Sequence, residues 1–549
     1  MQIPPSRSRL LSLALVAALA LLISACAVTV DDIATSTDAD VAIKTPAPLP
    51  TNADSPEDSE SSATPGAAAG ATSIPPADSP PADPSSGDDG AAADSDEESA
   101  DDQPRPPTVG EIGSAGAGDL YYPTYGNGGY DITNYYLDLD WDHDARDLTG
   151  EATITMTTVQ PLRQFNLDLV GFDVTSILVD GEPAEFARDG RELIIKPATV
   201  LELGAEATVV VAYEGRPTLL DSIGAPFSTG WTDLGDTIVV VGEPEGAAGW
   251  YPVNEHPIDK ATYTIEVTTR SDLVVAANGI QVSVAEEGDN RTWIYQSLNP
   301  QAAYLTTLAI GDFVFHDGED SQSGVDVRHF FHSTTFEQSV ATMQRTGDMI
   351  DAFEARFGPY PFENYGAVVV DANLGFALET QTLSVFGADL VDSFASREDI
   401  VAHELAHQWF GNHVSLTQWS DIWLNEGFAS YSEYLWREAS DPDYDIDAAV
   451  RTDYEELAFL LDSPPGAPPS TDLFNPSVYL RGAFTLHALR TTIGDDAFFQ
   501  LLVTYVEEFG GGNATTNDFT SLAEDISGQD LDAFFDAWLL AGQLPPLPA

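Results

Sequence analysis

Two patterns of apolar and polar residues divide the chain. From Tyr121 to Phe315, apolar and polar residues alternate over short segments, and Gly, Asn and Asp separate these segments at turn positions. Such alternation is typical of β-strands that bury one face. It predicts strands at residues 152–158, 193–196, 207–213, 237–241, 261–269 and 292–295. We therefore expect an all-β domain of sandwich type over residues 119–315.

Beyond residue 316 the apolar residues recur at helical spacing. A first predicted helix ends at Gly358-Pro359 and carries Val340, Met343, Ile350, Phe353 and Phe357. Extended segments follow at 367–370 and 374–386, and further helices are predicted at 397–411, 423–437, 453–461 and 479–492. We expect a mainly helical second domain over residues 316–549, so the fold class is multidomain β plus α/β.

The first residues of the chain have the features of an export signal. Arg7 and Arg9 precede an apolar run over residues 10–23, which is short for a membrane span and ends in Ser24-Ala25-Cys26. Residues 23–26 also resemble a bacterial lipobox, in which the peptide is cleaved before a lipidated cysteine. Cys26 is the only cysteine of the chain. We expect residues 1–25 to be a signal peptide and Cys26 the lipidation site, although an ordinary signal peptide with an incidental cysteine is the alternative.

Residues 26–118 consist mainly of Ala, Asp, Ser, Pro, Gly and Glu and contain scarcely any aromatic residue. Such a segment buries too little apolar surface to offset its loss of conformational entropy. We expect a disordered acidic tether that holds the folded part away from a membrane. Together with Cys26, this predicts an exported protein, lipid-anchored to the outer face of the cell membrane.

The net charge narrows the range of partners. The chain carries 89 Asp and Glu against 21 Lys and Arg, a formal net charge of −68. The excess remains in the predicted folded part, since residues 119–549 contain seventeen basic and seventy acidic residues. Repulsion between these acidic side chains and phosphate groups argues against nucleic acid and against an anionic membrane surface as partners.

One pentapeptide has the composition and spacing of a metal-binding motif. His403-Glu404-Leu405-Ala406-His407 places two imidazoles one helical turn apart on the same face, and Glu426 follows after eighteen residues. Two imidazole nitrogens and a carboxylate suit a catalytic Zn²⁺, which keeps a fourth position for water. Glu404 lies beside the ligand face, where it can act as general base. The alternative is an exposed helix that carries these residues by chance.

These residues, together with four other segments, resemble the gluzincin metallopeptidases of the aminopeptidase N family. The resemblance covers about residue 130 to the end of the chain. The other matching segments are Ala303-Tyr304-Leu305, Phe357-Gly358-Pro359-Tyr360-Pro361-Phe362, Trp423-Leu424-Asn425-Glu426-Gly427 and Val478-Tyr479-Leu480-Arg481-Gly482. The resemblance implies an N-terminal saddle domain, a thermolysin-like catalytic domain, one zinc ion per chain and peptide substrates.

It also implies roles for three further residues. Tyr479 matches the tyrosine that stabilises the oxyanion of the tetrahedral intermediate, which is sound chemistry for a phenol donor. Glu379 and Glu243 match carboxylates that bind the α-amine of the substrate. The segment around Glu379 departs from the family's Gly-x-Met-Glu-Asn pattern, because Phe376, Leu378 and Thr380 stand where the family has Gly, Met and Asn. Each of the three also has an ordinary alternative, a packed tyrosine or an exposed strand-end charge.

The sequence therefore favours a zinc aminopeptidase and leaves two alternatives. One is a zinc endopeptidase, and the other is a non-catalytic surface-binding lipoprotein on a peptidase fold. About seventy residues follow Tyr479, so we expect a catalytic domain without the family's C-terminal superhelix and with a more open cleft. His413 and His487 are expected to pack rather than to bind metal. Oligomeric state is not predicted.

Overall fold

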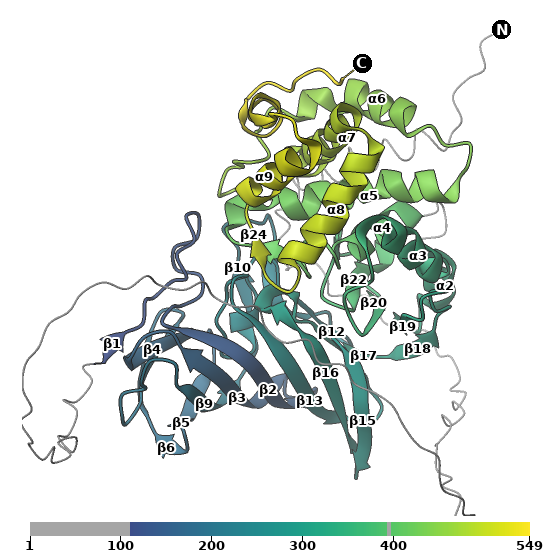
Figure 1. Cartoon of the computed structure of the whole chain (residues 1–549). Helices are drawn as coiled ribbons and strands as arrows, with labels where there is room; N and C mark the ends of the chain where they lie inside the picture. The colour runs from purple at the N-terminus through teal and green to yellow at the C-terminus, as the bar shows by residue number, and fades with distance from the viewer. Residues whose placement is uncertain (1–109, 392–396, 549) are drawn as a thin grey trace, which may run out of the picture. The chain divides into compact units, whose positions relative to one another are not determined.

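The computed structural model describes residues 110–391 and 397–548 of the chain (Figure 1). The predicted signal peptide, Cys26 and most of the predicted tether lie outside the described residues. One boundary needs correction. Strand β1 (Glu111–Ile112) pairs in parallel with β4 (Leu162–Asp168), so β structure begins within the stretch that was assigned to the tether. The prediction missed it because a two-residue strand leaves no alternation to detect.

An eight-stranded sheet forms the largest part of the N-terminal half. Its central strands bury every second residue, as β13 does along its whole length, which confirms the alternation in the sequence. In order across the sheet, the strands are β15 (Ile280–Glu287), β16 (Asn290–Ala302), β13 (Lys260–Arg270), β2 (Tyr130–Asp142), β3 (Asp147–Thr158), β9 (Glu206–Gly215), β5 (Asp173–Val179) and β6 (Glu182–Pro183).

Two smaller sheets share a hydrophobic core with this sheet, which confirms the predicted all-β domain. Leu137 and Ile154 of the large sheet, Phe165 of the second and Val240 of the third belong to the same buried cluster. The second sheet has the order β1, β4, β8 (Glu192–Lys196) and β7 (Glu185–Asp189). The third has the order β10 (Leu219–Asp221), β11 (Ser228–Asp233), β12 (Ile238–Val241), β17 (Leu308–Gly311) and β14 (Val274–Ala277).

A fourth sheet spans the boundary predicted at residues 315 and 316. Strand β18 (Phe313–Asp317) contains that boundary and pairs with β19, so it belongs with the second domain. The order is β18, β19 (Asp326–His332), β20 (Asn364–Val370), β22 (Ser384–Gly387) and β21 (Ala377–Leu378). The extended segment expected over 374–386 forms only β21 and the first part of β22, because the chain turns between them at Thr382, whose φ is 65°.

Helices make up most of the remaining residues, as expected. They are α2 (Phe336–Met343), α3 (Thr346–Phe357), α4 (Glu398–Ala406), α5 (Trp423–Ser440), α6 (Ile446–Leu457), α7 (Gly482–Ile493), α8 (Asp495–Phe509), α9 (Thr516–Ser527) and α10 (Asp532–Phe535). A short parallel pair, β23 (Ser415–Leu416) with β24 (Asn513–Ala514), lies among them. No helix among residues 110–391 and 397–548 is both long enough and apolar enough to cross a membrane.

The predicted helices differ in their bounds: the first is divided into α2 and α3, and α5 continues to Ser440. Helix α4 ends at Ala406 rather than at residue 411, because the chain then turns and Gly411 adopts a φ of 120°. Helix α6 begins at Ile446, where the Asp445 side chain accepts a hydrogen bond from the backbone of Ala448. Residues 477–481 form a π-helical turn, η7 (Ser477–Arg481), before the regular helix α7.

The β domain contacts the second domain through a lysine. The ammonium of Lys260, at the start of β13, donates hydrogen bonds to the carbonyls of Asn412 (2.9 Å), His413 (3.0 Å) and Gly512 (3.2 Å). Asn412 and His413 belong to the turn that follows α4. Lys260 therefore fastens the strand of one domain to the loop behind the metal-motif helix of the other.

We expect Lys260→Met to lower the free energy of unfolding by about 1–3 kcal/mol, because it leaves backbone carbonyls without donors. Chemical denaturation of the purified protein measures this change. The matched control is Lys196→Met, since Lys196 is exposed on β8 and such surface changes alter stability by about 0.5 kcal/mol or less. Equal effects of the two substitutions would contradict the assignment.

Candidate metal centre

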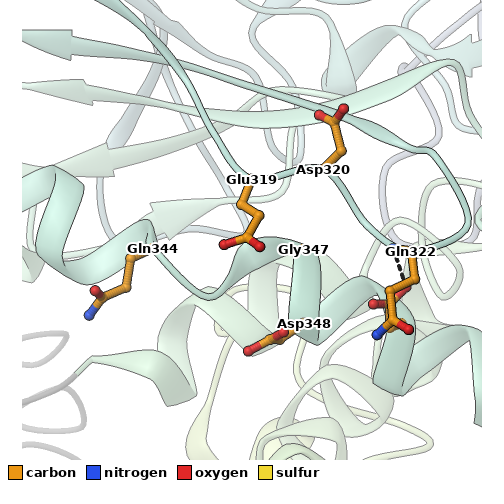
Figure 2. Close-up of a pocket in the computed structure, with 7 residues that line it drawn as sticks. Glu319, Asp320, Gln322, Gln344, Gly347 and Asp348 are labelled. Carbon is orange, nitrogen blue, oxygen red and sulfur yellow. Dashed lines mark hydrogen bonds between the residues drawn. The ribbon is translucent and has the colours of Figure 1, made fainter.

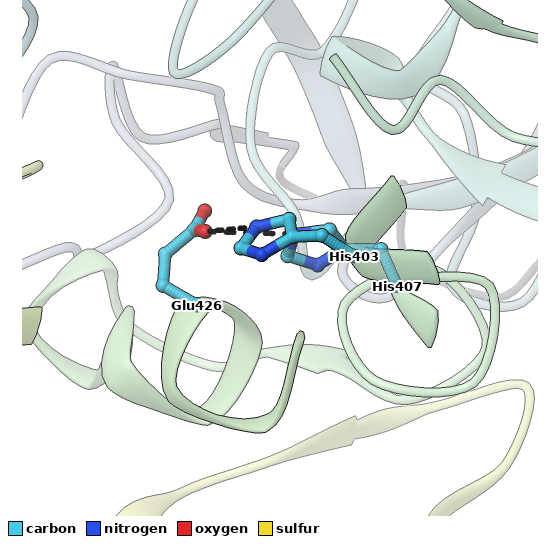
Figure 3. A group of neighbouring side chains, drawn as sticks. All are labelled: His403, His407 and Glu426. Atoms are coloured by element: carbon cyan, nitrogen blue, oxygen red, sulfur yellow. Dashed lines mark hydrogen bonds and ion pairs between the residues drawn. The ribbon is translucent and has the colours of Figure 1, made fainter. Parts of the chain in front are cut away.

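Two buried helices bring three candidate ligands together (Figure 3). Helix α4 carries His403 and His407, and α5 carries Glu426 in its first turn. The Nε2 atoms of His403 and His407 lie 3.3 Å and 3.5 Å from Oε2 of Glu426. The three ligand atoms all lie within 4.8 Å of one another, so a single ion can contact them.

Both histidines are oriented through their other ring nitrogen. Nδ1 of His407 donates to the backbone carbonyl of Phe410 (3.1 Å), and Nδ1 of His403 donates to Glu433 (3.0 Å). These bonds leave Nε2 of each ring facing Glu426. Metal-binding histidines in proteins show the same arrangement, and two imidazoles with one carboxylate are the donor set of catalytic zinc. The residues present therefore fit zinc.

Glu433 was not found from the sequence. It lies on α5 seven residues after Glu426, and this spacing of two helical turns puts both carboxylates on one helix face. The i+7 spacing was a usable signal, because a ligand histidine usually needs a second partner. Burial opposes the charged imidazole, but Glu426 and Glu433 hold the pKa of His403 well above its usual value.

Glu404 is buried beside the ligand group. A carboxylate oxygen of Glu404 lies within 4.8 Å of ligand atoms of His407 and Glu379. Burial raises the pKa of Glu404 to about 8, against the opposing effect of the two histidines. A divalent cation at the neighbouring ligands adds positive charge and lowers that pKa, which favours the basic form.

Tyr479 reaches the site from the π-helical turn η7. Its ring stacks on the imidazole of His403, with centroids 6.1 Å apart and planes at 21°. Burial and the nearby carboxylates, Glu426 first among them, raise the pKa of Tyr479 well above its usual value. The phenol therefore keeps its proton and remains a hydrogen-bond donor.

Arg481 fixes the turn that carries Tyr479. It is fully buried, and its guanidinium donates to the carbonyls of Trp538 (2.7 Å), Ala537 (3.0 Å) and Ala541 (2.6 Å). These carbonyls lie at η8 (Asp536–Leu540) and directly after it. An arginine supplies more donors in a rigid plane than a lysine does. The sequence did not predict this contact.

Glu379 is held through its backbone. Its carbonyl accepts hydrogen bonds from Nδ2 of Asn412 (2.7 Å) and Nε2 of Gln408 (3.1 Å), both in or near the metal motif. Oε1 of Glu379 is buried and has no hydrogen-bond partner, and the same holds for Oε1 of Glu243. Glu243, Glu379 and Glu426 each place a carboxylate oxygen within 4.8 Å of the others. Since Glu404 also places a carboxylate oxygen within 4.8 Å of Glu379, the structure gathers all four predicted site glutamates.

A second carboxylate shapes the loop after Glu243. Oε1 of Glu255 accepts the backbone N–H of Gly246 (2.6 Å) and of Ala248 (3.3 Å), at the start of a short helical turn, η2 (Ala247–Gly249). Arg191 forms an ion pair with Glu255 from the other side. This loop follows β12 and Glu243 directly, so Glu255 fixes the backbone a few residues after Glu243. Neither residue was identified from the sequence.

Phe376, which departs from the family pattern, and two histidines outside the metal group, His413 and His487, each have an aromatic neighbour. Phe376 stacks on Phe227 of the β domain, with ring centroids 4.6 Å apart and planes at 11°. His413 contacts the ring of Phe362, and His487 forms a hydrogen bond with Tyr431 (3.3 Å). Among the described residues, neither histidine belongs to a group that could hold a metal ion.

A separate acidic hollow lies where the β18–β19 loop meets α3 (Figure 2). Its volume is about 270 Å³, and it contains none of the candidate ligands described above. Its lining residues are Glu319, Asp320, Gln322, Gln344, Gly347, Asp348 and Asp351. One carboxylate is already engaged, because Asp351 accepts the backbone N–H of Gln322 (2.9 Å).

We expect Glu433→Gln to weaken zinc binding about tenfold to a hundredfold, because the His403 ring loses its anionic partner. Titration against a chromogenic zinc chelator measures the affinity without any substrate. Glu438→Gln is the matched control on the same helix, since Glu438 pairs with Arg490 instead. Unchanged zinc affinity in Glu433→Gln would rule out the orienting role.

Comparison with known proteins supports this arrangement. The model of the peptidase M1 N-terminal domain matches residues 132–305, and that of the peptidase family M1 domain matches residues 341–538. Aminopeptidase M1-D of Oryza sativa subsp. japonica is 26% identical over 431 residues, which cover 74% of this chain and 49% of that protein. Aminopeptidase N of Lactococcus lactis is 25% identical over 438 residues and matches over 50% of its length. The chain thus spans about half the length of these curated relatives.

Solved structures match over their whole length. The M1 zinc metallopeptidase of Deinococcus radiodurans is 31% identical, with a TM-score of 0.74, and the match covers 79% of this chain and 99% of that one. A substituted form of that enzyme, solved with a Tyr-Ser-Ala substrate, gives the same identity and TM-score and is covered completely. This relative, together with the two matching domains and the geometry of His403, His407 and Glu426, shows that the chain belongs to peptidase family M1, a family with zinc metallopeptidase members.

Proposed function

We propose that this chain is a zinc-dependent aminopeptidase that removes N-terminal residues from peptides and binds one catalytic zinc ion. The observation that carries the proposal is the pair of unpartnered oxygens on Glu243 and Glu379 beside the metal ligands. Buried carboxylate oxygens without donors are costly, and the ammonium group of a peptide supplies charged donors in the right number. The homologous aminopeptidases and the substrate-bound relative support this assignment.

The residues of the chain divide the reaction between them. When bound, zinc supplies a Lewis acid that polarises the scissile carbonyl and activates water. His403, His407 and Glu426 hold the ion. The carboxylate of Glu404 removes a proton from the attacking water and returns it to the leaving amine. The O–H of Tyr479 donates to the oxygen on which negative charge develops, which stabilises the transition state more than the ground state.

Glu243 and Glu379 determine which peptides fit. They bind the ammonium at one end of the substrate, so the scissile bond is the one that follows the first residue. A peptide without a free amine leaves the two carboxylates buried and unpaired, which disfavours its binding. Phe376, three residues before Glu379, stands in place of the glycine of the family pattern and stacks on Phe227.

We extend the proposal to the location of the enzyme. Arg7, Arg9 and the apolar run before Cys26 support export, and the single cysteine at the lipobox position supports a lipid anchor. The anchor would fix the enzyme to the outer face of the cell membrane through the acidic segment that follows. Peptides outside the cytoplasm are then its substrates. Nucleic acid is an unsuitable partner for a chain with a net charge of −68.

The central test compares matched peptides with free and acetylated N-termini. We expect cleavage of the free peptide one residue from its N-terminus and no measurable cleavage of the acetylated one. Mass spectrometry of the products identifies the cleaved bond. Equal cleavage of both peptides would establish an endopeptidase instead, and zinc binding without turnover of either would indicate a binding protein.

Glu379→Gln should raise KM for free peptides about tenfold to a hundredfold, because it removes one charge-assisted hydrogen bond to the ammonium. Zinc content, measured by elemental analysis, should remain at that of the wild type. A KM equal to that of the wild type would exclude Glu379 from amine binding. Asp351→Asn, in the acidic hollow, controls for the loss of one negative charge.

Glu404→Gln should lower kcat about 10²–10⁴-fold, the usual contribution of a general acid–base. The isosteric amide cannot accept the proton of water, but the three metal ligands remain. We therefore expect full zinc content in the inactive variant. Substantial residual turnover would show that another group moves the proton.

A further inference from the structure

Three carboxylates form a second candidate ligand group next to the zinc ligands. Glu243, Glu379 and Glu426 each place one carboxylate oxygen within 4.8 Å of the other two, and all three residues are buried. Glu426 belongs also to the group with His403 and His407. A carboxylate has two oxygens, so Glu426 can serve both groups.

Two of these carboxylates have no partner for one oxygen. Oε1 of Glu243 and Oε1 of Glu379 are buried without a hydrogen bond, and the two side chains are 6% and 2% exposed. Among residues 110–391 and 397–548, no lysine or arginine forms an ion pair with Glu243, Glu379 or Glu426. The anionic group is thus assembled without an internal cation.

The site holds more carboxylates than the zinc ligand group uses. Glu243 and Glu379 lie outside the group of His403, His407 and Glu426, yet each has a buried oxygen without a hydrogen-bond donor. The ammonium of a peptide supplies donors to these oxygens, and between turnovers the chain itself supplies none. Buried carboxylate oxygens without a partner favour the binding of a cation.

We propose that Glu243, Glu379 and Glu426 form a second cation site, which takes a hard divalent cation such as Mn²⁺ or Ca²⁺ and competes with the ammonium group of the substrate. An all-oxygen donor set without imidazole favours such ions. The site is weaker than the zinc site, because it lacks nitrogen ligands and shares Glu426. The competition rests on the proposed aminopeptidase function, whereas the binding of the cation does not.

Counting bound manganese tests the site without turnover. The full chain, loaded with one equivalent of zinc, is titrated with Mn²⁺, and free Mn²⁺ is followed by electron paramagnetic resonance. We expect one more saturable Mn²⁺ per chain in the wild type than in Glu379→Gln or in Glu243→Gln. Zinc content and circular dichroism confirm that each variant is folded. Equal Mn²⁺ binding by the wild type and both variants would overturn the proposal.

The acidic surface requires a matched control. Asp351→Asn removes one carboxylate from the hollow of Figure 2, which lies outside the ligand groups, and should leave the saturable Mn²⁺ in place. Loss of that Mn²⁺ in Asp351→Asn, with retention in Glu379→Gln, would place the ion in the hollow and overturn the proposal.

Competition with a peptide locates the ion at the amine position. In the Glu404→Gln background, where turnover is about 10²–10⁴-fold slower, a free tripeptide such as Tyr-Ser-Ala should displace the second Mn²⁺, and its N-acetylated form should not. Displacement by neither peptide would overturn the competition. A chain that binds the second Mn²⁺ but cleaves acetylated peptides would disprove the aminopeptidase and leave the cation site standing.

Discussion

Electrostatic repulsion among buried carboxylates is the constraint on which the rest of the site depends. Glu243, Glu379, Glu404 and Glu426 come from two domains and four separate chain segments, and nothing in their own chemistry holds them together. Their assembly is a cost that the rest of the fold offsets by packing and hydrogen bonding. Cations that bind there, whether zinc or an ammonium group, recover part of that cost.

The chain positions these carboxylates through backbone contacts rather than through opposite charges. Gln408 and Asn412 hold the carbonyl of Glu379, and Glu255 gathers the backbone N–H groups after Glu243. The fully buried Arg481 and the partly buried Lys260 are likewise bound to backbone carbonyls. These two side chains join separate chain segments but do not pair with the site carboxylates. The carboxylates therefore stay available to cations from outside the chain.

The sequence predicted the parts of the site that follow from local spacing. His403, His407 and Glu404 share one helical turn, and the β and helical halves differ in periodicity, so both were accessible from the residues alone. Glu426 followed from its spacing to the motif and from the donor set of zinc. Tyr479, Glu379 and Glu243 were located by family resemblance, and the structure brings their side chains to the same place. Contacts that depend on long-range packing, such as those of Glu255, Lys260 and Arg481, cannot be recognised from the spacing of apolar and polar residues in the sequence. The π-helical turn at Tyr479 was also missed, because an extra residue in a turn does not alter the apolar pattern enough to detect.

The buried guanidinium of Arg481 links the order of synthesis to the completion of the site. Among its acceptors are the carbonyls of Ala537, Trp538 and Ala541, which follow Arg481 in the chain by 56 to 60 residues and are therefore synthesised after it. A nascent chain that already contains the metal motif still lacks the groups that hold the Tyr479 turn. Tyr479 therefore takes its place beside His403 only after the chain has been made as far as Ala541, well after the metal motif itself.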